Sequence, residues 1–157
     1  MITEELANVA ALIRGQRQAA LATLRDNTPF VSMVAYAPEP DFGGFLLHLS
    51  RLAAHTNQLL ANPASSLLIC EGDDGRDDVQ TLARITLAGT TTPLSEAERA
   101  AGRALYLARL PAAAQLFELP DFVLFRFVPN EARYVGGFAR AFSLTAERLR
   151  QASDVNG

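Results

Sequence analysis

The chain breaks into short apolar segments separated by turn-forming residues, and this pattern constrains the fold more than any other feature. Arg25-Asp26-Asn27-Thr28-Pro29 joins two such segments directly, which predicts a hairpin. Six or seven strands with few helices between them predict an antiparallel sheet and not alternating βαβ units. The strand-like segments are 18–24, 30–36, 45–49, 66–71, 81–92 and 122–128, with shorter ones at 133–135 and 141–144.

Helical patterns are confined to a few places along the chain. Ser95 and Glu98 form a capping box, and Thr145 is expected to cap a closing helix. Because closure removes the exposed edges of such a sheet, we expect a mainly β protein with a small barrel and peripheral helices. The 157 residues contain no linker or repeat, so we expect one domain over 1–157. The other predicted helices are 3–14, 51–61 and 112–117.

Charge and hydropathy exclude several kinds of partner. The net charge of −3 is spread along the chain, so no nucleic-acid surface is expected. No apolar run reaches bilayer length, and the first ten residues lack the basic segment of a signal peptide. We therefore expect a cytoplasmic protein with no membrane contact. Cys70, in the apolar run 67–70, is expected to be a packed core thiol in a reducing compartment.

All fourteen basic residues are arginine, and the chain has no lysine. This excludes a Schiff base with pyridoxal phosphate and a P-loop lysine. A phosphate group must then be held by arginine, histidine, hydroxyl groups or backbone amides, and the planar guanidinium suits that task.

The segment 49–56 is the most informative stretch. Ser50 is predicted to cap a helix that begins at Arg51, which places Arg51 and His55 on one face, one turn apart. Free amides and the helix dipole favour an anion at that end. The sequence leaves open a phosphate site or, alternatively, a solvated arginine beside a surface histidine.

Two further segments are also open to more than one interpretation. Arg84 stands among apolar residues of a strand, where arginine is costly without an anion. That anion is either a ligand or a carboxylate of the same or a second subunit. The segment 133–140 combines two glycines, two aromatic residues and two arginines, which fits either a flat ligand or a tight turn.

The remaining polar residues predict no chemistry. The acidic loop 72–78 lacks the spacing of a calcium loop, and His48 is expected to be a paired strand residue. Two histidines and one cysteine, well separated, predict no metal site. No hydroxyl has a base at a recognisable spacing, so the catalytic residues are unknown.

In their order along the chain, these segments resemble the pyridoxamine-phosphate-oxidase-like FMN-binding split barrels. The resemblance runs from about Gln18 to Phe142, and the Ser-Arg-Leu…His-Thr string and 134–141 are similar to the haem-utilisation (HugZ-like) subgroup. It rests on the hairpin 20–34 and on the segments 49–63, 84–89 and 134–141.

The resemblance implies a six- to seven-stranded antiparallel split β-barrel that binds FMN at the interface of a homodimer. In the family, one strand lies beside the isoalloxazine ring, a strand end and helix hold the phosphate, and one side chain of a later strand reaches the flavin. The matching residues are Val31, Ser32 and Met33 for the ring, Ser50, Arg51, His55 and Thr56 for the phosphate, and Arg84 for the flavin contact.

The chain also departs from the family in two ways. His55 stands where the oxidase has a phosphate-binding lysine, so oxidation of pyridoxamine phosphate is not expected. The subgroup's His-Thr-x-Asn becomes His55-Thr56-Asn57-Gln58, which leaves the roles of Asn57 and Gln58 open. Haem-degrading members carry a C-terminal extension with the iron's histidine. This chain ends about twenty residues after Gly137 without one, so that route is not expected.

The resemblance therefore implies an FMN-dependent oxidoreductase that acts on an unknown small molecule. Two alternatives remain: a haem-binding or haem-handling protein, and a non-catalytic flavin-binding module. A visible spectrum distinguishes flavin from haem.

Overall fold

The two strands on either side of the predicted turn form a hairpin, β1 (Gln18–Arg25) with β2 (Thr28–Ala35), paired along their whole length. The computed structural model describes residues 3–137 and 140–155. Within these ranges the strands form one antiparallel eight-stranded sheet in the order β2-β1-β5-β6-β7-β4-β3, with β8 paired to β7. The predicted mainly β, antiparallel split-barrel fold is confirmed.

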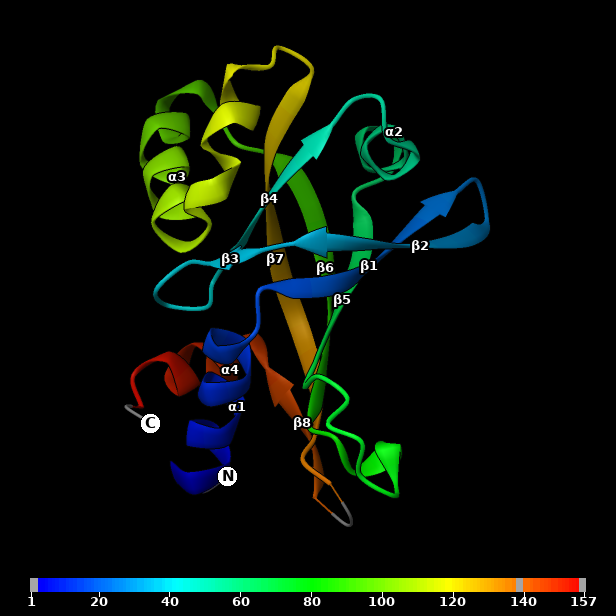
Figure 1. Cartoon of the computed structure of the whole chain (residues 1–157), viewed down its shortest axis with the longest axis vertical. Coiled ribbons are helices and arrows are strands. Elements are labelled where there is room, and N and C mark those ends of the chain that lie inside the picture. The colour runs from blue at the N-terminus through cyan, green and yellow to red at the C-terminus, as the bar shows by residue number, and fades with distance from the viewer. Residues whose placement is uncertain (1–2, 138–139, 156–157) are drawn as a thin grey trace.

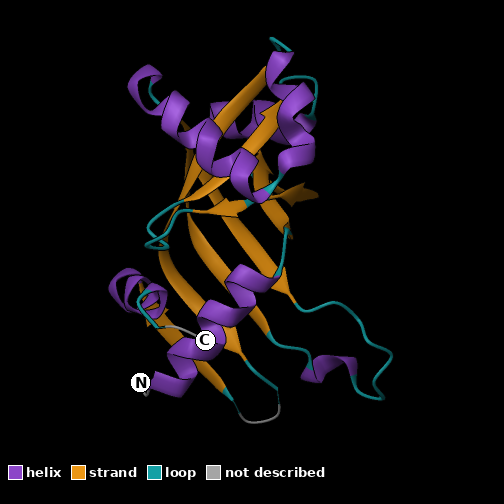
Figure 2. Ribbon diagram, turned by 60° about the vertical axis from the view of Figure 1, so that its left-hand side comes forward, coloured by secondary structure: helices purple, strands orange, loops and turns teal. Residues whose placement is uncertain are grey.

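The sheet curls, and the helices gather at its two ends (Figures 1 and 2). At one end α1 packs against α4, and at the other lie α2, α3 and the 3₁₀ segment η2. The remaining strands are β3 (Ala37–Pro38), β4 (Phe45–Ser50), β5 (Ala64–Cys70), β6 (Arg84–Pro93), β7 (Phe122–Val135) and β8 (Ala141–Thr145); the helical elements are α1 (Thr3–Gly15), α2 (Ala54–Ala61), η1 (Val79–Thr81), α3 (Glu96–Arg109), η2 (Pro111–Glu118) and α4 (Ala146–Ser153).

The core lies on the concave face of the sheet. Cross-strand pairing aligns one row of apolar side chains over five strands, each at most 4% exposed: Leu21, Leu67, Leu87, Ala132 and Leu144. Burying one leucine side chain stabilises a fold by about 1.5–3 kcal/mol. A second cluster forms between β4, β7 and α3 and includes Leu46, Tyr106 and Leu124. This second cluster holds α3 against the sheet.

Two local expectations are confirmed at helix starts. The Ser95 backbone amide donates to Glu98 Oε1 at 3.3 Å at the start of α3. The Arg148 amide donates to Thr145 Oγ1 at 3.1 Å at the start of α4.

The expected strands 122–128 and 133–135 are one strand, β7. Pro129 suggests a break because it has no N–H, yet it lies opposite Gly89, where the β6–β7 register shifts. A Cβ at Gly89 would collide with the Val128 carbonyl, so only glycine fits this bulge. The segment expected as a strand from Thr81 also differs, since Thr81 closes the 3₁₀ turn η1 and the strand begins at Arg84.

Cys70 is not a core thiol. Alternate residues of β5 point to opposite faces: Leu67 and Ile69 are buried in the core, whereas Leu68 and Cys70 lie on the outer face and are partly exposed. The apolar run 67–70 therefore covers both faces of the sheet, and its outer half remains open in a single copy of the chain.

Candidate functional site

The candidate phosphate site begins where β4 ends. Ser50 remains in the sheet, paired with Phe122, and its hydroxyl donates to Asp121 Oδ2 at 2.9 Å. Ser50 Oγ also accepts from the Leu52 amide at 3.1 Å. The Arg51 amide donates to the Asp121 carbonyl at 2.7 Å, which fixes this turn to the start of β7.

The helix therefore starts three residues later than the sequence predicts. Its first residue is Ala54, and the N-cap is Ala53, whose side chain offers no hydrogen bond. The prediction of Ser50 as the helix cap is wrong, because the Ser50 hydroxyl is held by Asp121. The prediction that Arg51 and His55 share one helical face is also wrong, because Arg51 precedes the helix.

Asn57 and Gln58, whose roles the sequence left open, are structural. The Asn57 side-chain amide donates to the Arg51 carbonyl at 3.0 Å and so braces the turn. The Thr23 hydroxyl donates to Gln58 Oε1 at 2.6 Å and ties α2 to β1.

The first turn of α2 has two polar side chains without a partner among the described residues. Thr56 is 0% exposed, and its Oγ1 has no hydrogen bond. His55 is half-buried, and burial lowers the pKa of its imidazole. No side chain caps the helix and no acidic residue lies in its first turn. These features make an electropositive end with free amides, which suits an anion.

The three residues predicted on β2 do not share a face. Val31 and Met33 lie on the outer face and are 64% and 71% exposed. Ser32 points to the opposite side, because it pairs with the core residue Leu21. That side also carries Thr23, which is bound to α2. Of the three, Ser32 is the one whose side chain lies on the side of α2.

Arg84 lies on the outer face, directly opposite Cys70. Its Nη1 donates to the carbonyls of Gln80 at 2.6 Å and Leu82 at 3.1 Å. Within the described residues it pairs with no carboxylate of its own chain, and carbonyl oxygens of the η1 turn accept from one of its nitrogens. Val31, Met33 and Arg84 thus share one face, with a hollow of about 340 Å³ bounded by Met33, Leu68 and Cys70.

The described part of the 133–140 segment forms a turn. The Gly136 amide donates to the Arg140 carbonyl at 2.8 Å, and Gly137 has a φ of +113°, a conformation that favours glycine. The Tyr134 ring stacks on Phe142, with the centroids 5.0 Å apart. Phe138 and Ala139 lie outside the described residues.

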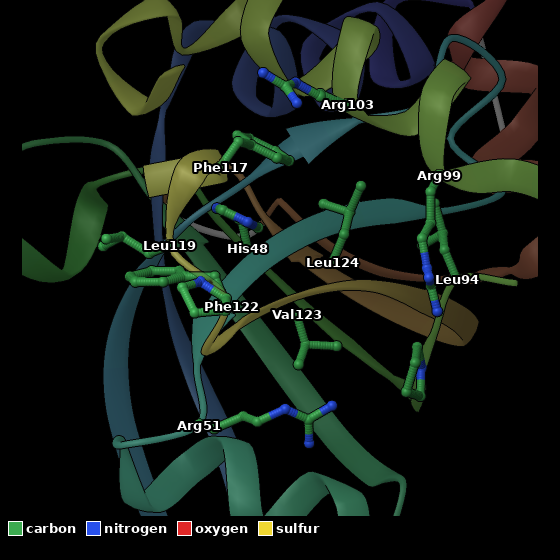
Figure 3. Close-up of a pocket in the computed structure, with 12 residues that line it drawn as sticks. His48, Arg51, Leu94, Arg99, Arg103, Phe117, Leu119, Phe122, Val123 and Leu124 are labelled. Carbon is green, nitrogen blue, oxygen red and sulfur yellow. The ribbon is translucent and has the colours of Figure 1, made fainter. Parts of the chain in front are cut away.

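The structure also contains a cavity that the sequence did not predict, of about 410 Å³, between the end of β4, α3 and the start of β7 (Figure 3). Three arginines surround it: Arg51, Arg99 and Arg103. One wall is aromatic, because His48 lies between Phe117 and Phe122. The spacing of Arg99 and Arg103, one turn apart on a helix, was the only sequence signal for this site.

Two other kinds of feature, a metal cluster and a membrane-spanning helix, do not occur in the part of the chain that the structure describes. No three histidine, cysteine or acidic side chains of residues 3–137 and 140–155 are grouped to hold a metal ion. In the same ranges, no helix has the length and apolar character needed to span a bilayer.

Comparison with known proteins matches the chain to one family. Residues 6–136 match the model of pyridoxamine 5'-phosphate oxidase. An unconventional chloroplast haem oxygenase of Arabidopsis thaliana, HOZ, is 44% identical over 114 residues, which are 73% of this chain and 34% of that protein. This chain thus spans about a third of its curated relative.

Solved structures agree in fold. A haem-binding protein from Mycobacterium smegmatis superposes with a TM-score of 0.82 at 30% identity, over 93% of this chain and 60% of that one. Campylobacter jejuni ChuZ superposes with a TM-score of 0.81 at 17% identity, over 94% and 62%; at this identity the match speaks for the fold alone. Because the family model covers most of the sheet, the chain belongs to the pyridoxamine 5'-phosphate oxidase family and resembles its haem-binding relatives.

Proposed function

We propose that this protein is an FMN-binding flavoprotein whose α2 N-terminus holds the flavin phosphate, and that it acts as an oxidoreductase on a small molecule. The observation that carries the proposal is the uncapped first turn of α2, where His55 and Thr56 have no partner among the described residues. Family membership supports a flavin at this segment.

The predicted residues fit a phosphate to different degrees. His55 and Arg51 each offer a side chain with no hydrogen-bond partner among the described residues, and the amides of the first turn add donors. Ser50 does not fit, since its hydroxyl already donates to Asp121. The Thr56 hydroxyl is closed off from solvent, so contact with a phosphate requires a small opening of the first turn.

When bound, FMN supplies the redox chemistry of the protein. The chain supplies binding and electrostatics. Burial lowers the pKa of His55 in the free protein, which favours the neutral ring. A phosphate dianion beside the ring raises that pKa, so His55 gains a proton more readily when FMN is bound. FMN affinity should therefore rise as the pH falls from 8 to 6.5, and this dependence should be absent in His55→Gln. An equal pH dependence in both proteins would exclude His55 from the phosphate site.

We further infer that the flavoprotein is a homodimer. Val31 and Met33, together with the partly exposed Leu68, form an apolar patch on the outer face. A patch of this kind on a soluble chain usually marks an interface, and a second copy would cover the open half of the 67–70 segment. We place the dimer in the cytoplasm, in keeping with a single free cysteine.

Haem handling is the second candidate. It is favoured by two relatives, the chloroplast haem oxygenase at 44% identity and the mycobacterial haem-binding protein at 30%. Haem iron is commonly held by a histidine, and the chain has only two. His48 is stacked on Phe117 with ring centroids 3.7 Å apart and is almost fully buried, which leaves His55 as the accessible ligand.

The spectrum of the freshly purified protein distinguishes the candidates. Flavin bands that shift on denaturation, with one FMN per chain, would support the proposal. A Soret band without flavin would overturn it in favour of haem. If flavin is bound, turnover with a reductant and oxygen separates an enzyme from a flavin-binding module.

A further inference from the structure

The cavity between β4, α3 and β7 is strongly cationic in a chain that is acidic overall. Arg51, Arg99 and Arg103 line it, and no carboxylate is among its lining residues. The net charge of the chain is −3, so three arginines around one cavity of about 410 Å³ form a local excess of positive charge. Like charges gathered in this way are costly unless an anion binds between them.

Little in the described chain neutralises these guanidinium groups. Arg103 Nη2 lies 3.3 Å from Glu118 Oε1, but both side chains are largely exposed, and such pairs contribute little. Arg103 also lies over the Phe117 ring, 5.1 Å from its centroid. Arg51 and Arg99 have no ion pair or side-chain hydrogen bond among the described residues.

The wall behind the arginines is apolar and aromatic. Leu94, Val123 and Leu124 line it on one side, and Phe117 and Phe122 on the other (Figure 3). A volume of this size is within the range of small-molecule sites, which combine apolar walls with a few directed polar groups. The ligand therefore needs an apolar body as well as negative charge.

His48 gives a second, independent sign of a ligand. Its side chain is nine-tenths buried and lines the cavity, yet its Nδ1 has no hydrogen-bond partner. Burial and the charge of Arg103 lower the pKa of His48 to about 4, so the ring is neutral in the free protein. A buried imidazole without a partner is costly, and a bound oxyanion would supply one after a small shift that opens Nδ1 to the cavity.

We propose that this cavity is a second binding site, for a planar organic molecule that carries at least two oxyanion groups, carboxylate or phosphate. Guanidinium forks bind both groups in a bidentate manner, and the flat apolar body lies against the aromatic wall. The site is distinct from the phosphate site proposed at α2, although our proposals give Arg51 a role in both. Arg51 lines the cavity, whereas His55 and Thr56 do not.

Flavin-free protein titrated with naphthalene-2,6-dicarboxylate tests the proposal, read by ligand fluorescence and by the histidine ring resonances in NMR. With only two histidines, His55→Gln assigns both sets of resonances. We expect one molecule per chain and a shift of the His48 resonances only. The neutral dimethyl ester should bind at least tenfold more weakly.

Four variants test the location of the site. Arg99→Ala and Arg103→Ala should each weaken binding about tenfold or more, whereas Arg25→Ala, which removes an exposed charge elsewhere, should leave it unchanged. Glu118→Gln should strengthen binding, because it frees Arg103 from its carboxylate. None of these exposed side chains is needed for the core.

Three outcomes would overturn the proposal. The dimethyl ester could bind as tightly as the dicarboxylate, Arg25→Ala could weaken binding as much as Arg99→Ala and Arg103→Ala do, or the His48 resonances could stay unmoved. If inorganic phosphate at the same concentration displaced the dicarboxylate, the cavity would bind anions without selecting an apolar body, and the proposal would fail. Titration with 2-naphthyl phosphate decides which oxyanion is preferred. FMN affinity should be unchanged in Arg99→Ala and Arg103→Ala, and a loss there would place FMN in this cavity and refute a separate site.

Discussion

Replacing Thr56 by valine should change stability and flavin affinity in opposite directions. Thr56 is 0% exposed and its hydroxyl has no hydrogen-bond partner among the described residues. A buried hydroxyl without a partner costs about 1–3 kcal/mol, and valine has nearly the same shape without that hydroxyl. Valine and threonine also have similar helix propensities, so the backbone of α2 should be unaffected.

The flavin-free variant should therefore be more stable by about 1–2 kcal/mol. For a chain of this length that is a rise in Tm of roughly 2–8 °C. A hydrogen bond to a charged group contributes about 1.5–3 kcal/mol, so Thr56→Val should weaken FMN binding about 10- to 150-fold if the hydroxyl meets the phosphate. Differential scanning calorimetry and FMN fluorescence quenching measure the two effects.

Thr91→Val is the matched control. Thr91 is also 0% exposed, but its hydroxyl lies 2.7 Å from the Ser65 hydroxyl. This control should lose about 1 kcal/mol of stability and keep its FMN affinity. If Thr56→Val destabilised the protein as the control does, the Thr56 hydroxyl would have a partner and the reasoning would fail. If it stabilised the protein with unchanged FMN affinity, the phosphate would lie elsewhere.

Four other expectations are testable. Arg51→Ala should weaken FMN binding by about 1.5–3 kcal/mol in titrations. It should leave the weak binding of riboflavin, which lacks the phosphate, unchanged. An equal loss of affinity for FMN and riboflavin would place Arg51 away from the phosphate. The pKa of His48 is about 4 when folded and 6.5 when unfolded, so the folded state binds fewer protons between these values, and stability falls as the pH drops through that window. Urea unfolding should show a loss of up to about 3 kcal/mol from pH 7 to 4 relative to His48→Gln, and parallel curves would refute it. Light scattering should give twice the 16.9 kDa chain mass. Met33→Asp should yield monomers, whereas Leu52→Asp, also at an exposed apolar residue, should not. A monomeric parent protein with FMN bound would contradict the dimer. If haem binds, His55→Ala should abolish the Soret shift, in which case His55 is an iron ligand and not a phosphate ligand.

Features that depend on neighbours in sequence were predictable. The turn at 25–29 fixes the β1–β2 hairpin, and the capping residues at Ser95 and Thr145 fix the starts of α3 and α4. Strand alternation also identifies the core row, because its residues recur with period two. The family resemblance, now supported by the match over residues 6–136, specified the split-barrel form of the sheet, which local patterns do not.

Features that depend on distant partners were not predictable. The apolar run 67–70 indicated burial on both faces, but β5 covers a core on one side only, so Cys70 lies outside. Arg84 was expected to need an anion, and within its own chain its Nη1 donates to two backbone carbonyls, of Gln80 in the preceding 3₁₀ turn and of Leu82 just after it. In both places the composition of the segment indicated which kind of surrounding its side chains favour. It held no information about which chain segment provides that surrounding.

Asp121 shows how one such distant contact reorganises the site. It lies 71 positions from Ser50, and it accepts the Ser50 hydroxyl and the Arg51 amide through its side chain and backbone. Because Ser50 is thus kept in the sheet, α2 starts at Ala54, and its first turn has neither a capping side chain nor an acid. Arg51 lines the cavity beside α3, whereas His55 does not. A motif that reads as one anion site therefore becomes two cationic positions on either side of a turn. The proposed phosphate site would bind through the end of a helix, and the proposed second site through arginines of two elements that the sequence alone does not bring together.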